Sequence, residues 1–226
     1  MGKTDIQCLG FIMDGNRRWA KSRRLPTLAG HKRGQEVFQD CVRFVRDRNI
    51  PHAIFYAFST ENWQREKYEV DYLMSLFEDV LKKVLKETEE NKVKIKIIGR
   101  RSDFSLSLQK IMDQVEAKSR KYKSTTIWVA LSYGGRAELI DAVNKAVESG
   151  KKVSEENFKQ LLWTAKMPDP DMIIRTGGEQ RLSNFLPWQS TYSELYFIDK
   201  LWPALTKDDF EDILIEYEKR ERRRGK

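Results

Sequence analysis

Cysteine and histidine are scarce in this sequence of 226 residues, which holds two of each: Cys8, Cys41, His31 and His52. So few thiols and imidazoles argue against a zinc centre, a multi-histidine metal centre and a disulfide framework, all of which need more of these side chains. Cysteine often behaves as a small core residue, so we expect Cys8 and Cys41 to be buried free thiols.

Long apolar runs are also missing. No stretch approaches the ~20 apolar residues that span a bilayer, and the first ten residues lack the apolar core of a signal peptide, so we expect a cytoplasmic protein. The sequence contains no GxGxxG fingerprint of dinucleotide binding, and the pair Gly177-Gly178 lacks the GK[ST] ending of a Walker loop. No repeat, low-complexity segment or flexible linker divides the chain, which predicts one domain over residues 1–226.

Charge, in contrast, is abundant. The chain carries 42 Lys and Arg against 34 Asp and Glu, a net charge of +8, and 40% of its residues are hydrophobic. This balance is typical of a globular protein with an anionic partner. Nucleic acid, an anionic membrane and a phosphate-bearing substrate all fit, and composition does not choose among them.

Six short runs rich in β-branched and aromatic residues alternate with segments of helical period. The apolar runs cover residues 8–13, 52–58, 93–99, 125–133, 171–177 and 195–199, and the helical periods cover 33–49, 70–90, 104–121, 136–149, 154–166 and 207–224. This alternation predicts an α/β fold with a mostly parallel sheet flanked by helices. Ligands of such sheets lie beyond the carboxyl ends of the strands. We therefore expect one rim to gather the segments that follow four predicted strands: Asp14, Ser59–Asn62, Tyr133–Arg136 and Arg175–Gly178.

The stretch MDGNRRW at residues 13–19 places one acid ahead of several cations. Gly15 permits a turn and close approach of the backbone to a ligand. Backbone amides there, with Arg17 and Arg18, suit a diphosphate, and Asp14 suits Mg²⁺ bridging to it, because Mg²⁺ is commonly held by one or two carboxylates and substrate phosphates. A capped turn with solvated arginines explains the same residues without a ligand.

Two later stretches contain glycine pairs. Gly134-Gly135 in SYGGR opens a predicted helix, which fits either phosphate binding or a tight connection. RTGGEQRLSNFLPWQ brings Arg175, Arg181 and Ser183 together, and guanidinium groups bind phosphate oxygens in a bidentate way. We expect a second diphosphate there, with Glu194 as a second possible carboxylate for a metal ion.

Taken together, these stretches resemble the cis-prenyltransferases, the undecaprenyl diphosphate synthase family. The resemblance runs from about residue 10 to residue 225 and rests on MDGNRRWA, GHKRG, YAFSTENWQR, SYGGR, IRTGGEQRLSNFLPWQ and the closing RERRRG. It implies a single α/β domain whose mostly parallel, six-stranded sheet is flanked by helices, with an apolar tunnel between sheet and helices. It also implies an enzyme that joins isopentenyl diphosphate to an allylic diphosphate, forms a Z double bond and releases pyrophosphate.

The resemblance also implies roles for particular residues. Asp14 would bind Mg²⁺ and assist departure of the allylic diphosphate, Glu194 would complete the metal site, and Asn62 would orient the diphosphate oxygen that takes the proton. A turn-forming asparagine is the alternative for Asn62. The remaining residues expected to contact substrate are Gly15, Asn16, Arg17, Arg18, Trp19, His31, Ser59, Thr60, Glu61, Trp63, Arg65, Arg175, Arg181, Leu182 and Ser183.

By the same resemblance, the apolar stripe of residues 70–90 would wall a tunnel for the growing chain, and ordinary core packing explains it equally well. Arg223-Arg224-Gly225 resembles the family's RxG tail, which implies a homodimer whose tail reaches the neighbouring site; a solvated basic tail is the alternative. Thr27 stands where many members carry an arginine that contacts the allylic diphosphate. We expect a long Z-polyprenyl diphosphate of the undecaprenyl type, the lipid carrier of glycan synthesis, made from farnesyl or geranylgeranyl diphosphate.

Rival interpretations remain open at this point. A short-chain or non-head-to-tail cis-prenyl synthase would share the same motifs. A basic nucleic-acid-binding module accounts for the charge but not for the motifs, and a non-catalytic accessory subunit usually lacks the aspartate motif that is present here. The acidic run at residues 208–212 matches the DDxxD pattern of the all-helical trans-prenyltransferases. It follows Thr206, however, so Thr206 and Asp209 predict a helix capping box instead.

Overall fold

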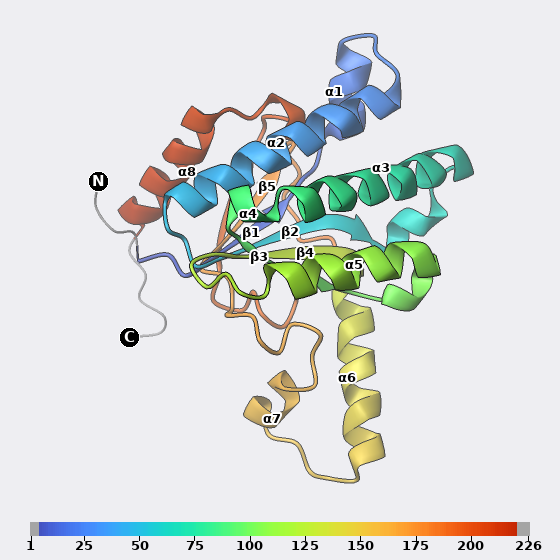
Figure 1. The fold of residues 1–226 in the computed structure, drawn as a ribbon. Coiled ribbons are helices and arrows are strands. Elements are labelled where there is room, and N and C mark those ends of the chain that lie inside the picture. Colours follow the sequence, from blue (N-terminus) through green and yellow to red (C-terminus); the bar gives the residue numbers. More distant parts are fainter. Residues whose placement is uncertain (1–4, 221–226) are drawn as a thin grey trace.

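The computed structural model describes residues 5–220, and its centre is one sheet of six strands in the order β3-β4-β2-β1-β5-β6 (Figure 1). All five strand pairings are parallel. The strands are β1 (Cys8–Ile12), β2 (His52–Ser59), β3 (Lys94–Ile98), β4 (Thr126–Tyr133), β5 (Met172–Thr176) and β6 (Glu194–Ile198). Each falls in one of the six predicted runs, so the predicted α/β class and parallel sheet are confirmed.

The helices occupy most of the segments with helical period. They are α1 (Asn16–Ser22), α2 (Thr27–Asp47), α3 (Lys67–Lys86), α4 (Thr88–Asn91), α5 (Leu106–Ser119), α6 (Gly135–Ser149), α7 (Glu155–Lys159) and α8 (Lys207–Lys219). Three 3₁₀ helices add single turns: η1 (Thr60–Gln64), η2 (Arg101–Asp103) and η3 (Trp202–Ala204). None of the described helices is long and apolar enough to cross a membrane.

Several helix boundaries differ from the sequence prediction. The helix predicted over 33–49 begins six residues earlier, at Thr27, because Pro26 supplies a start that periodicity does not register. The segment 70–90 divides into α3 and α4, and 154–166 is helical only over α7. The helix α1 was not predicted at all, because seven mostly polar residues give no apolar period.

The two faces of the sheet bury different clusters, as the alternation of side chains along a strand requires. On β1, Leu9 and Phe11 face the larger core, which α2, α3, α5 and α8 cover, whereas Cys8 and Ile12 face a smaller one with Phe185. Helix α6 extends away from the sheet beside α7 (Figure 1). Cys8 and Cys41 are both buried free thiols, as predicted.

Two local contacts fix the approach to the site. Helix α1 packs against α2 at two glycines: a Cβ at Gly30 would lie 2.0 Å from the Asn16 carbonyl oxygen, and one at Gly34 would lie 2.2 Å from Asn16 Oδ1. The predicted capping box is present at α8, where the backbone N–H of Thr206 donates to the carboxylate of Asp209 at 2.7 Å. The acidic run therefore starts a helix and lies outside the site described below.

Candidate active site

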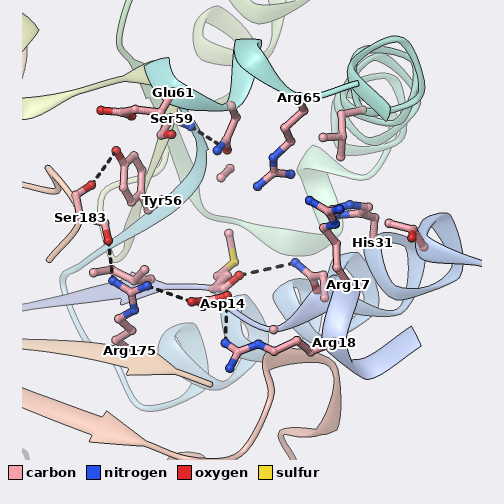
Figure 2. A pocket seen from close by; sticks show the side chains of 18 of the residues that line it. Asp14, Arg17, Arg18, His31, Tyr56, Ser59, Glu61, Arg65, Arg175 and Ser183 are labelled. Carbon is pink, nitrogen blue, oxygen red and sulfur yellow. Dashed lines mark hydrogen bonds and ion pairs between the residues drawn. The ribbon is translucent and has the colours of Figure 1, made fainter. Parts of the chain in front are cut away.

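A cavity of ≈ 1150 Å³ opens beyond the carboxyl ends of β1, β2 and β5, the position predicted for a ligand (Figure 2). Among the described residues that line it are six Lys or Arg side chains and two carboxylates. The cations are Arg17, Arg18, Lys21, Arg24, Arg65 and Arg175, and the acids are Asp14 and Glu61. A concave site with this excess of positive charge is suited to an anionic ligand with several phosphate oxygens.

Asp14 follows β1 and lies between two arginines. Its Oδ2 accepts a hydrogen bond from Arg175 Nη2 at 2.9 Å, and its Oδ1 lies 3.3 Å from Arg18 Nη2. The side chain remains 32% exposed. Gly15 turns the chain at this point with φ +111, a conformation that L-residues avoid, and a Cβ there would approach Leu201 to 2.8 Å.

Arg175 connects Asp14 to the loop that follows β5. Its Nη1 donates to the Arg181 carbonyl at 2.6 Å and to the Ser183 hydroxyl at 2.7 Å, while its side chain is only 5% exposed. The loop turns sharply there, with Ser183 and Asn184 in the left-handed region. The Arg175 guanidinium thus holds the two predicted diphosphate-binding stretches together.

A second cluster of cations forms the opposite wall of the cavity. His31 from α2, Arg65 from the end of η1 and Arg17 from α1 all line it, and Figure 2 shows them grouped across from Arg175. Burial lowers the pKa of His31, and a hydrogen bond to Glu69 opposes part of that effect. Burial likewise lowers the pKa of Arg65, again opposed by Glu69.

The sequence motifs do not predict a role for Glu69, although it lies four residues after Arg65 in the first turn of α3. That spacing permits an ion pair on one helix face, and Arg65 Nη1 does donate to Glu69 Oε1 at 3.0 Å. The residue contacts the cations from behind and does not itself line the cavity.

The segment after β2 forms η1 and supplies polar groups to the rim. The Oδ1 of Asn62 accepts the backbone N–H of Ser59 at 3.1 Å, which completes a capping box. Glu61 accepts a hydrogen bond from Asn184 Nδ2 at 2.8 Å; burial opposes ionisation, but hydrogen bonds from Asn184 and its neighbours hold the Glu61 pKa below its usual value. Ser59, Glu61 and Asn62 line the cavity, whereas Thr60 does not.

Several predicted site residues lie elsewhere. Trp63 donates its indole N–H to Ser132 at 2.9 Å and packs on the larger core. The Trp19 ring lies under Arg23, and its Nε1 is buried without a hydrogen-bond partner among the described residues. Arg181 also lies outside the cavity lining and pairs with Glu179. Leu182 packs on the smaller core instead. The Tyr133–Arg136 segment does not line the cavity either.

Glu194 lies at the other end of the sheet from Asp14. Glu194 is the first residue of β6 and pairs with Met172 of β5. Three residues further along both strands, Phe197 pairs with Arg175, and Arg175 in turn pairs with Ile12 of β1, close to Asp14. The two carboxylates are therefore at least roughly 10 Å apart along the strands. Within one chain the predicted pairing of Asp14 and Glu194 on one ion is not formed, and Glu194 instead accepts a hydrogen bond from Arg220 at 2.9 Å.

Two smaller cavities continue inward between the sheet and the helices α2 and α3. The first, of ≈ 120 Å³, shares Met13, Tyr56, Ala57 and Leu73 with the outer cavity. The second, of ≈ 100 Å³, is mostly apolar and shares with the first the side chains of Phe38, Phe77, Val80 and Val129. Phe77, a partly buried residue of α3, therefore lies where the two inner cavities meet.

Similarity to known proteins agrees with this arrangement. Residues 12–225 match the profile of the undecaprenyl diphosphate synthase family. An isoprenyl transferase of Thermotoga maritima is 46% identical over 224 residues, which cover 97% of this chain and 96% of that protein. An isoprenyl transferase of Aquifex aeolicus is 42% identical over 96% of this chain and 95% of that protein.

Solved structures show the same fold. Lavandulyl diphosphate synthase from Lavandula x intermedia, crystallised with dimethylallyl diphosphate, superposes with a TM-score of 0.93 at 34% identity, covering 98% of both chains. A probable undecaprenyl diphosphate synthase from Campylobacter jejuni superposes with a TM-score of 0.84 at 34% identity, covering 99% of this chain and 100% of that one.

Proposed function

The chain belongs to the undecaprenyl diphosphate synthase family of prenyltransferases, and we propose that it condenses isopentenyl diphosphate with an allylic diphosphate at the cavity around Asp14. The observation that carries this proposal is that a cation-rich outer cavity shares lining residues with mostly apolar inner cavities. An isoprenoid diphosphate needs both environments, one for its charged head and one for its hydrocarbon tail. We propose that residues 1–226 act as one catalytic domain.

Mg²⁺ fits the donor set at Asp14. Within residues 5–220 no group of three or more His, Cys, Asp or Glu side chains gathers to hold a metal ion by itself. One half-exposed carboxylate beside a phosphate-binding cavity is instead suited to an ion that takes its other ligands from substrate and water. Bound there, Mg²⁺ would supply Lewis-acid stabilisation of the charge that develops on the departing diphosphate.

The side chains around the cavity would divide the remaining work. His31, Arg65 and Arg17 are in place to hold the allylic diphosphate as its C–O bond breaks, because preorganised cations stabilise developing negative charge without reorganising. Arg175 and Ser183, which line the cavity, would take the diphosphate of isopentenyl diphosphate together with Arg181, whose side chain would turn from Glu179 toward it. A carbon–carbon bond then forms, a proton leaves, and pyrophosphate is released.

Asn62 is better suited to orient a phosphate than to remove that proton. Its Oδ1 already accepts the Ser59 N–H at 3.1 Å, so its remaining hydrogen-bonding groups are the two amide N–H donors. An amide is also a poor base. We therefore propose that Asn62 donates to a diphosphate oxygen, and that this oxygen accepts the proton.

The inner cavities favour a long product. Each isoprene unit that enters them removes further apolar surface from water, at ~25 cal/mol per Å². A chain that fills the first inner cavity must pass Phe38 and Phe77 to reach the second. We propose a long Z-polyprenyl diphosphate of the undecaprenyl type, a lipid carrier for glycan synthesis, and a cytoplasmic enzyme that meets the membrane through this lipid.

The decisive experiment incubates the purified protein with Mg²⁺, isopentenyl diphosphate and one primer at a time: dimethylallyl, geranyl, farnesyl or geranylgeranyl diphosphate. Mass analysis of the resulting alcohols should show long chains from the farnesyl or geranylgeranyl primer. Absence of product in every arm would refute the proposed reaction, and products that stop at geranyl or farnesyl length would refute the long-chain part. Phe77→Ala should lengthen the products. Tyr68→Ala should not, because Tyr68 is 59% exposed on the outside of α3.

A second candidate follows from the structural similarity to lavandulyl diphosphate synthase. That enzyme was crystallised with dimethylallyl diphosphate. Thr27, at the position where the family resemblance implies an arginine, lines the present cavity. An arm with dimethylallyl diphosphate alone tests it, because coupling without isopentenyl diphosphate would indicate a non-head-to-tail synthase.

We also propose a homodimer. Ile140, Val143 and Val147 form an exposed apolar stripe on α6, at 62%, 44% and 74% exposure, and β6 is an edge strand of the sheet. A second chain would cover such a face and could bring its Glu194 near the first chain's Asp14. Val143→Lys should shift the mass measured by light scattering from dimer to monomer.

The tail Arg223-Arg224-Gly225 lies outside the described residues. Deleting residues 222–226 should lower turnover far more than thermal stability.

A further inference from the structure

Glu69 is a buried carboxylate that contacts two arginines and one histidine from three separate elements. Its Oε1 lies 3.2 Å from His31 Nε2 of α2 and accepts a hydrogen bond from Arg65 Nη1 at 3.0 Å. Its Oε2 lies 3.9 Å from Arg17 Nε of α1. The Glu69 side chain is 1% exposed, so no ligand in the cavity reaches it directly.

The surroundings of Glu69 are positive. It lies in the first turn of α3, where the unpaired backbone N–H groups make the helix end positive. The guanidinium groups of Arg65 and Arg17 add to this positive surrounding. A buried charge is poorly screened, so it attracts the basic groups around it strongly and also repels an anion in the cavity at longer range.

We propose that Glu69 is a positioning residue, which anchors His31, Arg65 and Arg17 so that their remaining N–H groups point into the cavity at the diphosphate. This proposal rests on the function proposed above and adds a residue that does not touch substrate. The cations come from α1, α2 and η1, and Figure 2 shows them converging on one wall. Glu69 is the group that all three share.

Positioning and simple charge make opposite predictions for Glu69→Gln. If Glu69 acts only as a negative charge near an anion site, its removal makes the wall more positive, and diphosphate should bind more tightly. If it orients the basic groups, its removal leaves Arg65, Arg17 and His31 without their common partner, and diphosphate should bind more weakly. The sign of the change therefore decides between the two roles.

The experiment measures binding of inorganic pyrophosphate by calorimetry and steady-state kinetics with both substrates. For Glu69→Gln we expect the Kd of pyrophosphate to rise about ten- to a hundredfold, the range expected when hydrogen bonds to charged groups are lost. The KM of the allylic substrate should rise with it, while the KM of isopentenyl diphosphate changes little. Glu78→Gln is the matched control, because it removes a carboxylate from the same helix whose ion pair, among residues 5–220, is with Lys82 near the surface.

The pH dependence supplies a readout that a purely structural role would not change. His31 faces Glu69, Arg65 and Arg17. Of these three, Glu69 raises the pKa of His31, whereas Arg65 and Arg17 lower it. In Glu69→Gln the rise in pyrophosphate affinity that accompanies His31 protonation should therefore move to lower pH. Should this variant fail to fold, Glu69→Asp keeps the charge but withdraws it by one methylene, and the Kd should still rise.

Unchanged or tighter pyrophosphate binding in the folded variants would overturn the proposal. Weaker binding by Glu69→Gln in a protein that makes no prenyl product would support the positioning role and refute the proposed reaction. Conversely, active wild-type protein with unaltered binding in Glu69→Gln would refute the positioning role alone.

Discussion

The two walls of the outer cavity are each organised around one carboxylate, and the two carboxylates differ in exposure. Asp14 bridges Arg18 and Arg175 with 32% of its side chain exposed. Glu69 joins His31, Arg65 and Arg17 with 1% exposed. Both are neutralised by arginine, so their local charge is similar. On the proposed function, exposure rather than pairing would separate the carboxylate that binds a metal from the one that orients its neighbours.

Replacing Asp14 should give the largest effect. Asp14→Asn keeps the volume but removes the charge and the metal ligand, so we expect kcat to fall by at least about 10²–10³, the size of effect seen when a preorganised contact to a reacting group is lost. Turnover at saturating substrates and excess Mg²⁺ measures it, with thermal unfolding as the control. Near-wild-type turnover would place the metal elsewhere and end the contrast with Glu69.

Changing the partner of Asp14 should have the next largest effect. Lysine at position 175 cannot reproduce the three contacts that the Arg175 guanidinium makes to Asp14, the Arg181 carbonyl and Ser183. We expect Arg175→Lys to lower kcat/KM by about tenfold or more and the free energy of unfolding by about 1–3 kcal/mol. Urea titration and initial rates provide the two values. A variant with normal stability would show that Arg175 does not hold the two stretches together.

Arg17 tests how far the influence of Glu69 extends. Its side chain is 61% exposed and lies 3.9 Å from Glu69, whereas Arg65 is 29% exposed and lies at 3.0 Å. Arg17→Gln should therefore raise the KM of the allylic diphosphate only about two- to threefold, since exposed ion pairs are worth ~0.2–1 kcal/mol. Arg65→Gln should raise it more. Equal effects in the two variants would contradict this ranking.

The smallest effect concerns stability against pH. The fold lowers the pKa of His31 below its ordinary 6.5, through burial, so below about pH 6.5 the unfolded chain binds more protons there than the folded chain does. The free energy of unfolding should consequently fall as the pH drops through that window. In His31→Gln this part of the slope should disappear. Urea titrations from pH 5 to pH 8 provide the comparison, and parallel curves would show that His31 does not contribute.

Much of the fold was predictable because apolar periodicity is a local signal. All six strands fall where runs such as HAIFYAFS and TIWVALSY occur, and the parallel arrangement follows from their alternation with helices. The rule that ligands bind beyond the carboxyl ends of strands located the cavity through Asp14 and Arg175. Helix α1 escaped prediction because its boundaries depend on the turn at Gly15 and on packing against α2.

The sequence does not predict the direction in which a side chain points. The motif YAFSTENWQR puts Trp63 two residues before Arg65, yet a 3₁₀ turn sends the indole into the core toward Ser132 and leaves Arg65 at the cavity. The family resemblance groups Glu194 with Asp14 as a second metal ligand, although the parallel register assigns it to the opposite end of the sheet within one chain. Glu69 carried only the weak signal of an acid four residues after an arginine.

The contact between Asn16 and the two glycines of α2 has a consequence for protein engineering. Because the first residue of α1 rests directly on the backbone at positions 30 and 34, no side chain larger than hydrogen fits at either without separating the two helices. A variant library designed to change primer preference should keep both glycines fixed. Its diversity belongs at Lys21, Arg24 and Thr27, where the cavity wall borders open space and new side chains can be tolerated.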